Sequence, residues 1–181
     1  GILQQTKRIS SIVRSLMNFS RSGSIGSEHQ AFELPPVIEE AIDLVRLTRA
    51  GKQVACSFTC PNDLKLVGDR QRLSQVLVNL LTNACDASDP GQRVEVLAFP
   101  AADNVQIEVM DNGKGIPKQA QEEIFEPFFT TKEPGEGTGL GLSMVYKIIQ
   151  EHNGRIEVDS APGLGTRVIV RLPQYPRAVE T

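Results

Sequence analysis

Tryptophan is absent from the 181-residue sequence, and only three cysteines and two histidines occur in it. An odd number of cysteines cannot pair completely in disulfides. Cys56 and Cys60 also have the wrong spacing for a zinc knuckle, with no histidine pair after them. We therefore expect these two residues and Cys85 to be small apolar residues of the interior. No apolar run reaches the roughly 20 residues of a membrane span, and the N-terminus lacks the pattern of a signal peptide.

No sign of charge dominates either, because the net charge is only -3. This balance excludes bulk electrostatic binding of nucleic acid or of an anionic membrane. A bound polyanion must therefore be held by local groups. With 40% hydrophobic and 23% charged residues, the composition is that of an ordinary globular protein with a core of its own.

The first segment of the chain is predicted to be an amphipathic helix, because Ile9, Ile12, Leu16 and Phe19 recur at heptad spacing. The glycine- and serine-rich stretch SGSIGSEHQ follows it. Such a helix packs either on its own domain or, as the linker favours, on a partner outside the chain. The predicted organisation is a helix over 1–24, a linker over 25–33, a domain over 34–174 and a tail over 175–181.

Within the predicted domain, segments of helical spacing are interspersed with segments of alternating polarity. Helices are predicted from Pro35 to Gly51, from Arg70 to Ser88, near residues 118–124, and through GLGLSMVYKIIQEH. Strands are predicted at VACSF, LKLVG, RVEVLAF, NVQIEVMD, RIEVDS and TRVIVRLP. Strands that pair in sequence, with helices on one face, predict an α/β (α+β) two-layer sandwich of a mixed sheet and about three helices.

Two asparagines interrupt the apolar stripe of the helix predicted over residues 70–88. Asn79 and Asn83 are four residues apart and therefore share a face of that helix. Amides at the edge of an apolar face need partners, and a metal ion with phosphate oxygens would supply them. A pair of ordinary surface amides explains this segment, taken alone, equally well.

Three further segments carry glycine, aromatic or charged residues. MDNGKGIP brings Asp111 to a strand end where glycines permit close approach of a ligand, although it is also ordinary turn chemistry. Residues 125–132, FEPFFTTK, contain three phenylalanines. The segment is either a hinged flap that apolar side chains hold in place, or a small apolar cluster beside the main core. GEGTGLGLS opens a helix, where Gly137, Gly139 and Gly141 would free backbone N–H groups for phosphate. This segment is neither a Rossmann fingerprint nor a P-loop.

In this order, the four segments resemble the N, G1, F and G2 boxes of sensor histidine kinases. The resemblance covers about residues 34–173 and includes the closing PGLGTRVIVRLP, and helix 2–21 is similar to the second helix of the family's dimerization domain. It implies the Bergerat fold, which type II topoisomerases, mismatch-repair proteins and a heat-shock chaperone share. It also implies ATP and Mg²⁺ as cofactors, and transfer of the γ-phosphoryl group to a histidine for relay to a response-regulator aspartate.

The resemblance implies roles for individual residues. Asn83 would bind Mg²⁺, with Asn79 one turn before it and Lys132 on the γ-phosphate, and these three would be the catalytic residues. Asp111 would accept a hydrogen bond from the adenine amino group, and Thr166 would support adenine through water. The implied nucleotide-binding residues are Asn83, Asp86, Asp111, Gly113, Gly115, Ile116, Phe125, Thr130, Thr131, Lys132, Gly137, Thr138, Gly139, Leu140, Gly141, Leu142 and Thr166.

Two features depart from the family pattern or leave a part of it unfilled. Many relatives carry a basic residue three positions after the Mg²⁺-binding asparagine, where Asp86 stands here, so Lys132, Mg²⁺ or the partner domain must neutralise phosphate. The resemblance also implies an ATP lid over residues 125–137.

The phosphoacceptor is the part of the pattern that is left unfilled. His29 lies in the linker and His152 at a helix end, and neither fits the setting of a phosphoacceptor. Both are expected at the surface, and the acceptor is expected outside the chain.

Alternative functions share the same fold. ATPases of the superfamily tend to have glutamate where Asn79 stands, and an amide is no base. A serine-kinase anti-sigma factor shares the fold, but the helix of residues 2–21 favours the sensor class. The four intact boxes argue against a degenerate nucleotide-binding or docking module.

The expected partners are a dimerization domain with the acceptor histidine and a response regulator, without nucleic acid. The expected parent is a homodimer with this domain in the cytoplasm, either free or anchored in the inner membrane.

Overall fold

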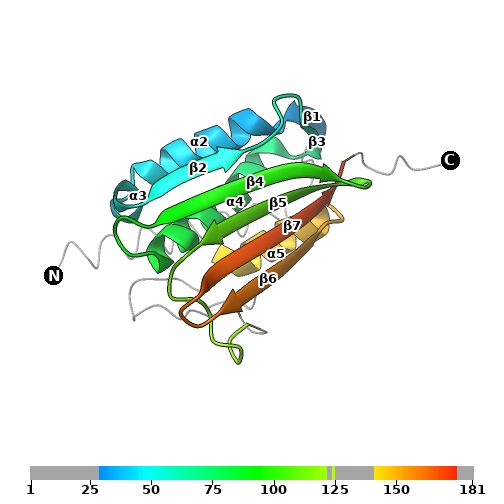
Figure 1. The fold of residues 1–181 in the computed structure, drawn as a ribbon. Coiled ribbons are helices and arrows are strands. Elements are labelled where there is room, and N and C mark those ends of the chain that lie inside the picture. The colour runs from blue at the N-terminus through cyan, green and yellow to red at the C-terminus, as the bar shows by residue number, and fades with distance from the viewer. Residues whose placement is uncertain (1–28, 122–123, 125–140, 175–181) are drawn as a thin grey trace, which may run out of the picture.

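The computed structural model describes residues 29–121, 124 and 141–174, which form a sheet layer and a helix layer (Figure 1). The sheet contains β2 (Ala55–Thr59), β4 (Arg93–Ala101), β5 (Asn104–Asp111), β6 (Arg155–Ala161) and β7 (Gly165–Pro173). Its strand order is β2-β4-β5-β7-β6, with β2 parallel to β4 and the other neighbours antiparallel. The predicted two-layer sandwich with a mixed sheet is therefore confirmed. The predicted helix of residues 2–21 and the tail of residues 175–181 lie outside the described residues.

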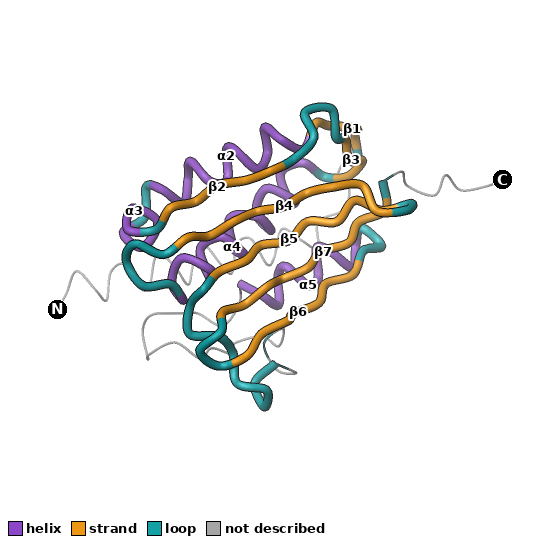
Figure 2. The backbone as a smooth tube through the Cα atoms, in the orientation of Figure 1, coloured by secondary structure: helices purple, strands orange, loops and turns teal. Residues whose placement is uncertain are grey.

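Helices of the described residues cover one face of this sheet (Figure 2). They are α2 (Leu34–Arg46), α3 (Arg49–Gln53), α4 (Arg70–Ala87) and α5 (Gly141–Glu151). The apolar stripes of α2, α4 and α5 form one core with the inner face of the sheet. Every residue predicted for the stripe of α4 is buried, namely Leu73, Val76, Leu77, Leu80, Leu81 and Ala84. None of the described helices is long and apolar enough to cross a membrane.

The long helix α4 begins where the sequence pattern places it. Asp69 has an extended backbone, and its side chain accepts a hydrogen bond from the Arg72 N–H at 3.2 Å. This N-cap satisfies one of the N–H groups that the first helical turn leaves free. The cap fixes the start of α4, and the buried apolar stripe places the polar residues of the helix on the side away from the core.

The helix predicted to end at Gly51 is interrupted earlier. α2 ends at Arg46, and Thr48 adopts an extended backbone conformation. The Thr48 hydroxyl accepts the Gly51 N–H at 3.0 Å and caps the separate short helix α3. A threonine that caps a helix cannot also continue one, which is why the prediction was wrong here.

The helix predicted near residues 118–124 is also absent from the described part of that segment, where residues 118–121 form turns.

A small second sheet lies beside the start of α2. β1 (Gln30–Glu33) pairs antiparallel with β3 (Lys65–Gly68), and the Leu34 N–H donates to the Leu64 carbonyl oxygen at 2.9 Å. Residues 30–33 had been predicted to belong to the linker. Their short, mostly exposed sequence shows no clear alternation, so their pairing depends on a partner more than 30 residues away. The linker is therefore shorter than predicted.

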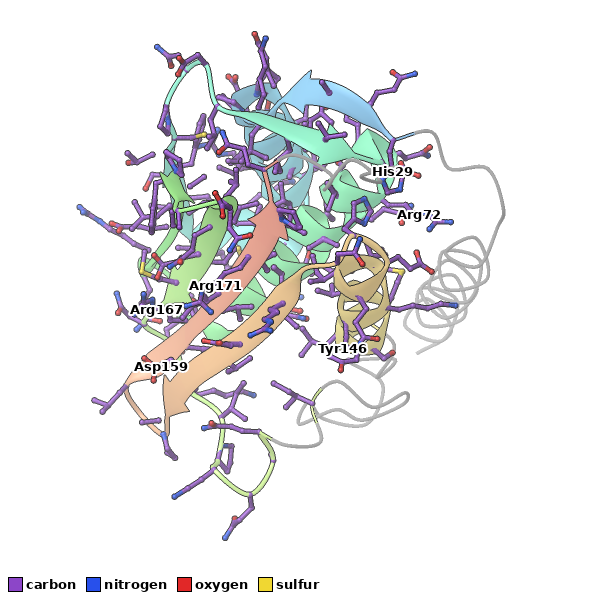
Figure 3. The ribbon with its side chains drawn as sticks, turned by 90° about the vertical axis from the view of Figure 1, so that its right-hand side faces the viewer. His29, Arg72, Tyr146, Asp159, Arg167 and Arg171 are labelled. Carbon is purple, nitrogen blue, oxygen red and sulfur yellow. The ribbon has the colours of Figure 1, made fainter. Side chains whose placement is uncertain are left out.

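His152 is buried, with 7% of its surface exposed, whereas the sequence predicted a surface histidine. Its Nε2 accepts the Asp69 N–H at 3.0 Å, and its Nδ1 lies 2.8 Å from the Ile148 carbonyl oxygen. The absence of a side chain at Gly68 makes room for its ring. The ring of His29 stacks on the ring of His152, with 4.9 Å between the two ring centroids. Figure 3 shows His29 at the same end of α5 as Arg72. The packing of the end of α5 on the start of α4 causes this burial.

His152 should make the stability of the domain depend on pH. Burial lowers the pKa of His152, and His29 lowers it further, against opposing effects of the Ile148 carbonyl oxygen, Asp69 and Glu151. The neutral ring therefore stabilises the fold above its usual pKa of about 6.5, and this contribution is lost as the pH falls below that value. We expect His152→Gln to remove this dependence, because glutamine does not titrate. It should cost about 1–3 kcal/mol at neutral pH, because a flexible amide replaces the rigid ring that bonds both the Asp69 N–H and the Ile148 carbonyl oxygen.

Urea unfolding at neutral and mildly acidic pH measures both effects. His29→Gln is the matched control, since it keeps both hydrogen bonds of His152. The same loss of stability on acidification in the parent and in His152→Gln would contradict the assignment.

Candidate functional site

Those predicted site residues that the structure describes lie at one end of the domain. β5 ends there with Asp111, beside the C-terminal half of α4, and the hairpin of β6 and β7 places Thr166 opposite Asp111. The beginning of α5 reaches the same region, because the position of a side chain at Gly141 would be 3.9 Å from Oδ1 of Asn79. Residues that are far apart in the sequence are thus assembled around the end of β5.

Asp111 is the buried carboxylate of this region, with 9% of its surface exposed. Its Oδ1 accepts the Gly113 N–H at 2.8 Å. Burial raises the pKa of Asp111, and the backbone N–H groups of Gly113 and Thr166 oppose this effect. Two backbone donors hold the carboxylate in a fixed orientation, and its remaining acceptor positions are available to a polar group of a ligand.

The loop after Asp111 packs tightly against its neighbours. A side chain at Gly113 would lie 2.1 Å from the Ala87 carbonyl oxygen, and one at Gly115, where φ is +74°, would lie 2.0 Å from the Ala161 carbonyl oxygen. Ala87 also accepts the Lys114 N–H at 3.2 Å. The sequence indicated that these glycines permit close approach of a ligand. In the structure they permit close approach of the end of α4 and of the β6–β7 hairpin.

Ser160 links the loop to that hairpin and was not predicted from the sequence. Its hydroxyl accepts the Ile116 N–H at 2.8 Å and lies 2.8 Å from the Thr166 hydroxyl. Gln121 adds bonds to the carbonyl oxygens of Ile116 at 3.0 Å and Ser160 at 2.9 Å. Neither residue stands in a recognisable motif, so only the folded structure shows that Ser160 and Gln121 connect the loop at Ile116 to the hairpin at Thr166.

The exposed side of α4 carries Asn83, the predicted metal ligand, together with Asn79 and Asp86. Asn79 and Asn83 are half-buried on this helix, and Asp86 is exposed one turn further on. Their side chains offer amide and carboxylate oxygens, which are the donors that Mg²⁺ prefers. The described residues contain no group of three or more histidine, cysteine or acidic side chains that could hold a metal by themselves. The donor set therefore fits a Mg²⁺ ion that takes its other ligands from phosphates and water.

Several predicted nucleotide-binding residues lie outside the described residues, and their roles stay predictions. Leu142 is described and is partly buried against the core at the start of α5. The undescribed residues are Phe125, Thr130, Thr131, Lys132, Gly137, Thr138, Gly139 and Leu140.

Two glycines of the β6–β7 hairpin provide a matched test of this packing. Gly163 and Gly165 have φ values of +79° and +87°, but only Gly165 leaves no space for a side chain, which would lie 2.1 Å from the Asp111 carbonyl oxygen. Both alanine variants should lose about 1–2 kcal/mol from the left-handed backbone. Gly165→Ala should lose about 1–3 kcal/mol more, because the Asp111 backbone must move.

Urea unfolding and ATP titration of both variants measure these effects. ATP affinity should fall in Gly165→Ala and persist in Gly163→Ala. Equal stability and equal affinity of the two variants would contradict this account.

Comparison with known proteins agrees with this arrangement. The model of the family "Histidine kinase-, DNA gyrase B-, and HSP90-like ATPase" matches residues 68–176. Sensor kinase CckA of Brucella abortus is 39% identical over 190 residues, an alignment that covers 96% of this chain and 20% of CckA. The catalytic domain of histidine kinase ThkA is 34% identical with a TM-score of 0.72, covering 81% of this chain and 96% of that domain.

A further solved structure contains histidine kinase ThkA in complex with the response regulator protein TrrA. Its matching chain is 30% identical with a TM-score of 0.79, covering 98% of this chain and 50% of that one. The resemblance stated from the four sequence segments is thus confirmed. By sequence and by fold, the chain belongs to the histidine kinase-, DNA gyrase B- and HSP90-like ATPases as the ATP-binding domain of a sensor histidine kinase.

Proposed function

We propose that this domain transfers the γ-phosphoryl group of Mg-ATP to a histidine of a dimerization domain, which passes it to an aspartate of a response regulator. The chain spans only 20% to 37% of the length of curated relatives that it matches, among them sensor kinase CckA and the sensor histidine kinase ZraS of Salmonella typhi. The activity and partners of the whole protein are therefore part of this proposal. Because ATP and receiver domains occur in the cytoplasm, we place the domain there.

The buried carboxylate of Asp111 is the observation that carries the proposal. It lies at the end of β5, and two backbone N–H groups orient it. A desolvated carboxylate is a strong acceptor for the exocyclic amine of adenine and a poor partner for the carbonyl oxygen that guanine has in that place. Thr166, whose hydroxyl is 2.8 Å from that of Ser160, would complete the adenine side.

The phosphate side would be formed by α4 and the segment before α5. Asn83 would hold Mg²⁺ through its amide oxygen, with Asn79 beside it, and Gly141 at the start of α5 would continue the phosphate cradle of Gly137 and Gly139. A bound Mg²⁺ ion supplies charge neutralisation of the phosphate oxygens. Lys132 would add a positive charge from the lid. Because Asn79 is an amide, it would not deprotonate water, which favours transfer to a histidine over hydrolysis.

The acceptor histidine would come from the dimerization domain of a second protomer or of another segment of the same parent. Both ring nitrogens of His152 have hydrogen-bonding partners within the fold, and its ring is buried. An imidazole in that setting has no free nitrogen for nucleophilic attack on phosphorus. The complex of histidine kinase ThkA with the response regulator TrrA supports a response regulator as the downstream partner.

Phosphotransfer from labelled ATP tests the proposal. The chain with Mg²⁺ and the parent's dimerization domain should label that domain with acid-labile, alkali-stable phosphate, and a response regulator should then remove the label. The chain alone should acquire no label, because His152 is sequestered and His29, which stacks on it, does not stand in the setting of a phosphoacceptor. Replacing the acceptor histidine is the matched control. Release of inorganic phosphate without labelling of the intact dimerization domain would overturn the kinase assignment in favour of an ATPase.

A further inference from the structure

Two cysteines that the nucleotide site does not use are in contact in the interior. The Sγ atoms of Cys56 in β2 and Cys85 in the last turn of α4 are 3.7 Å apart. Both side chains are buried, with 7% and 1% of their surfaces exposed. A disulfide requires a separation of about 2.05 Å. A small displacement of one helical turn or one strand would therefore bring the sulfur atoms within bonding distance.

Cys56 is the more acidic of the two thiols. The hydrogen bond with Cys85 lowers the pKa of Cys56 to about 7 against the effect of burial, and the Arg46 guanidinium lowers it further. This guanidinium also donates to the Cys56 carbonyl oxygen at 3.0 Å, so a positive charge lies beside this part of β2. Burial raises the pKa of Cys60 to about 11. Cys56 is thus the cysteine that reaches the nucleophilic thiolate form near neutral pH.

The partner thiol adjoins the nucleotide site. Cys85 immediately precedes Asp86 on α4, and its side chain is buried against Cys56. The same helical turn ends at Ala87, whose carbonyl oxygen accepts the Lys114 N–H at 3.2 Å. A movement of this turn toward β2 would therefore be transmitted to the loop that follows Asp111.

Cys56 belongs to an edge strand of the sheet. β2 is one of the two edge strands of the five-stranded sheet and is bonded on one side, to β4 (Figure 1). Edge strands open locally at lower free energy than central strands, because fewer backbone hydrogen bonds are broken.

We propose that Cys56 and Cys85 are a redox-sensitive pair that hydrogen peroxide converts to a disulfide, and that this bond weakens nucleotide binding. The Cys56 thiolate attacks one peroxide oxygen, the O–O bond breaks, and the departing hydroxide takes up a proton as water. Cys85 then attacks the sulfur of the Cys56 sulfenic acid, the S–O bond breaks, and a second water leaves with the Cys85 proton. The thiol pair loses two electrons and the peroxide gains them.

Thiol counting after oxidation tests the bond itself. The reduced chain is treated with hydrogen peroxide, unfolded, alkylated with N-ethylmaleimide and weighed. We expect one alkylated cysteine in place of three, a peptide pair joining Cys56 to Cys85, and recovery of all three thiols after reduction. Cys60→Ser is the matched control and should keep the disulfide, whereas Cys85→Ser should lose it. Three alkylated thiols after oxidation, or a bond that includes Cys60, would overturn the proposal.

Titration of ATP into the reduced and oxidised forms of Cys60→Ser tests the consequence. Binding should weaken several-fold on oxidation and recover on reduction. Equal affinity of the two forms would overturn the effect on the site while leaving the disulfide established. This second part rests on ATP binding to the domain. A reduced protein that binds no ATP would count against the nucleotide site, and thiol counting would still decide on the cysteine pair.

Discussion

Asn83→Ala should remove Mg²⁺-dependent ATP binding and leave the domain folded. Asn83 is half-buried on α4, with Asn79 one turn before it and Asp86 one turn after it. Alanine removes the amide oxygen and favours the helix. Replacing residues that only support a metal ligand costs about 10–100-fold in affinity, so loss of a ligand should cost about 100-fold or more. Calorimetric titration of ATP with Mg²⁺ and with EDTA measures the effect.

A glutamine on the same helix provides the control. Gln71 is exposed in the first turn of α4, far from the end that carries Asn83, and Gln71→Ala should bind Mg-ATP like the parent. Circular dichroism should show the same helix content in both variants. If folded Asn83→Ala binds Mg-ATP with the affinity of the parent, Asn83 is not the metal ligand.

Asp111→Asn should weaken ATP binding about tenfold or more and reduce the discrimination against GTP. A hydrogen bond to a charged group contributes about 1.5–3 kcal/mol, and asparagine retains the size but not the charge. The variant can also turn its amide N–H groups toward the guanine carbonyl oxygen. Competition between ATP and GTP measures both effects, with Asp103→Asn as the control, because Asp103 is exposed at the opposite end of β5.

The raised pKa of Asp111 adds a dependence on pH. Burial holds this pKa above its ordinary value, so acidification protonates the carboxyl before it protonates an exposed aspartate. The ratio of parent to variant affinity should fall as the pH is lowered into the mildly acidic range. This ratio cancels the titration of the phosphates themselves. A ratio that stays constant across that range would remove the carboxylate from adenine recognition.

Local patterns predicted most of the fold because they agree with the tertiary structure. The stripe of α4 and its cap Asp69 are signals contained within a few residues, and the hairpin of β4 and β5 joins two alternating segments through Ala102 and Asp103. Asp111 and Asn83 could be singled out for the same reason, because each stands in a segment whose glycines or apolar neighbours make it conspicuous. The arrangement of elements around them confirmed the family.

Features that depend on distant partners could not be predicted. β1 needs β3, the parallel alignment of β2 with β4 needs the crossover through β3 and α4, and the burial of His152 needs the start of α4. In the site, Ser160 and Gln121 carry no signal of their own, because any polar residue can stand in a strand or turn. The roles of the residues between 125 and 140 stay predictions.

The position of β5 has a consequence for the synthesis of the protein. β5 lies between β4 and β7, and β7 is the last strand in the sequence. Thr166, which pairs with Asp111, leaves the ribosome more than 50 residues after it. A nascent chain that lacks β7 exposes the hydrogen-bonding edge of its central strand, and the carboxylate of Asp111, which we propose binds adenine, lacks the donor that Thr166 supplies. Nucleotide affinity should therefore arise late and abruptly during translation, when the last strand docks.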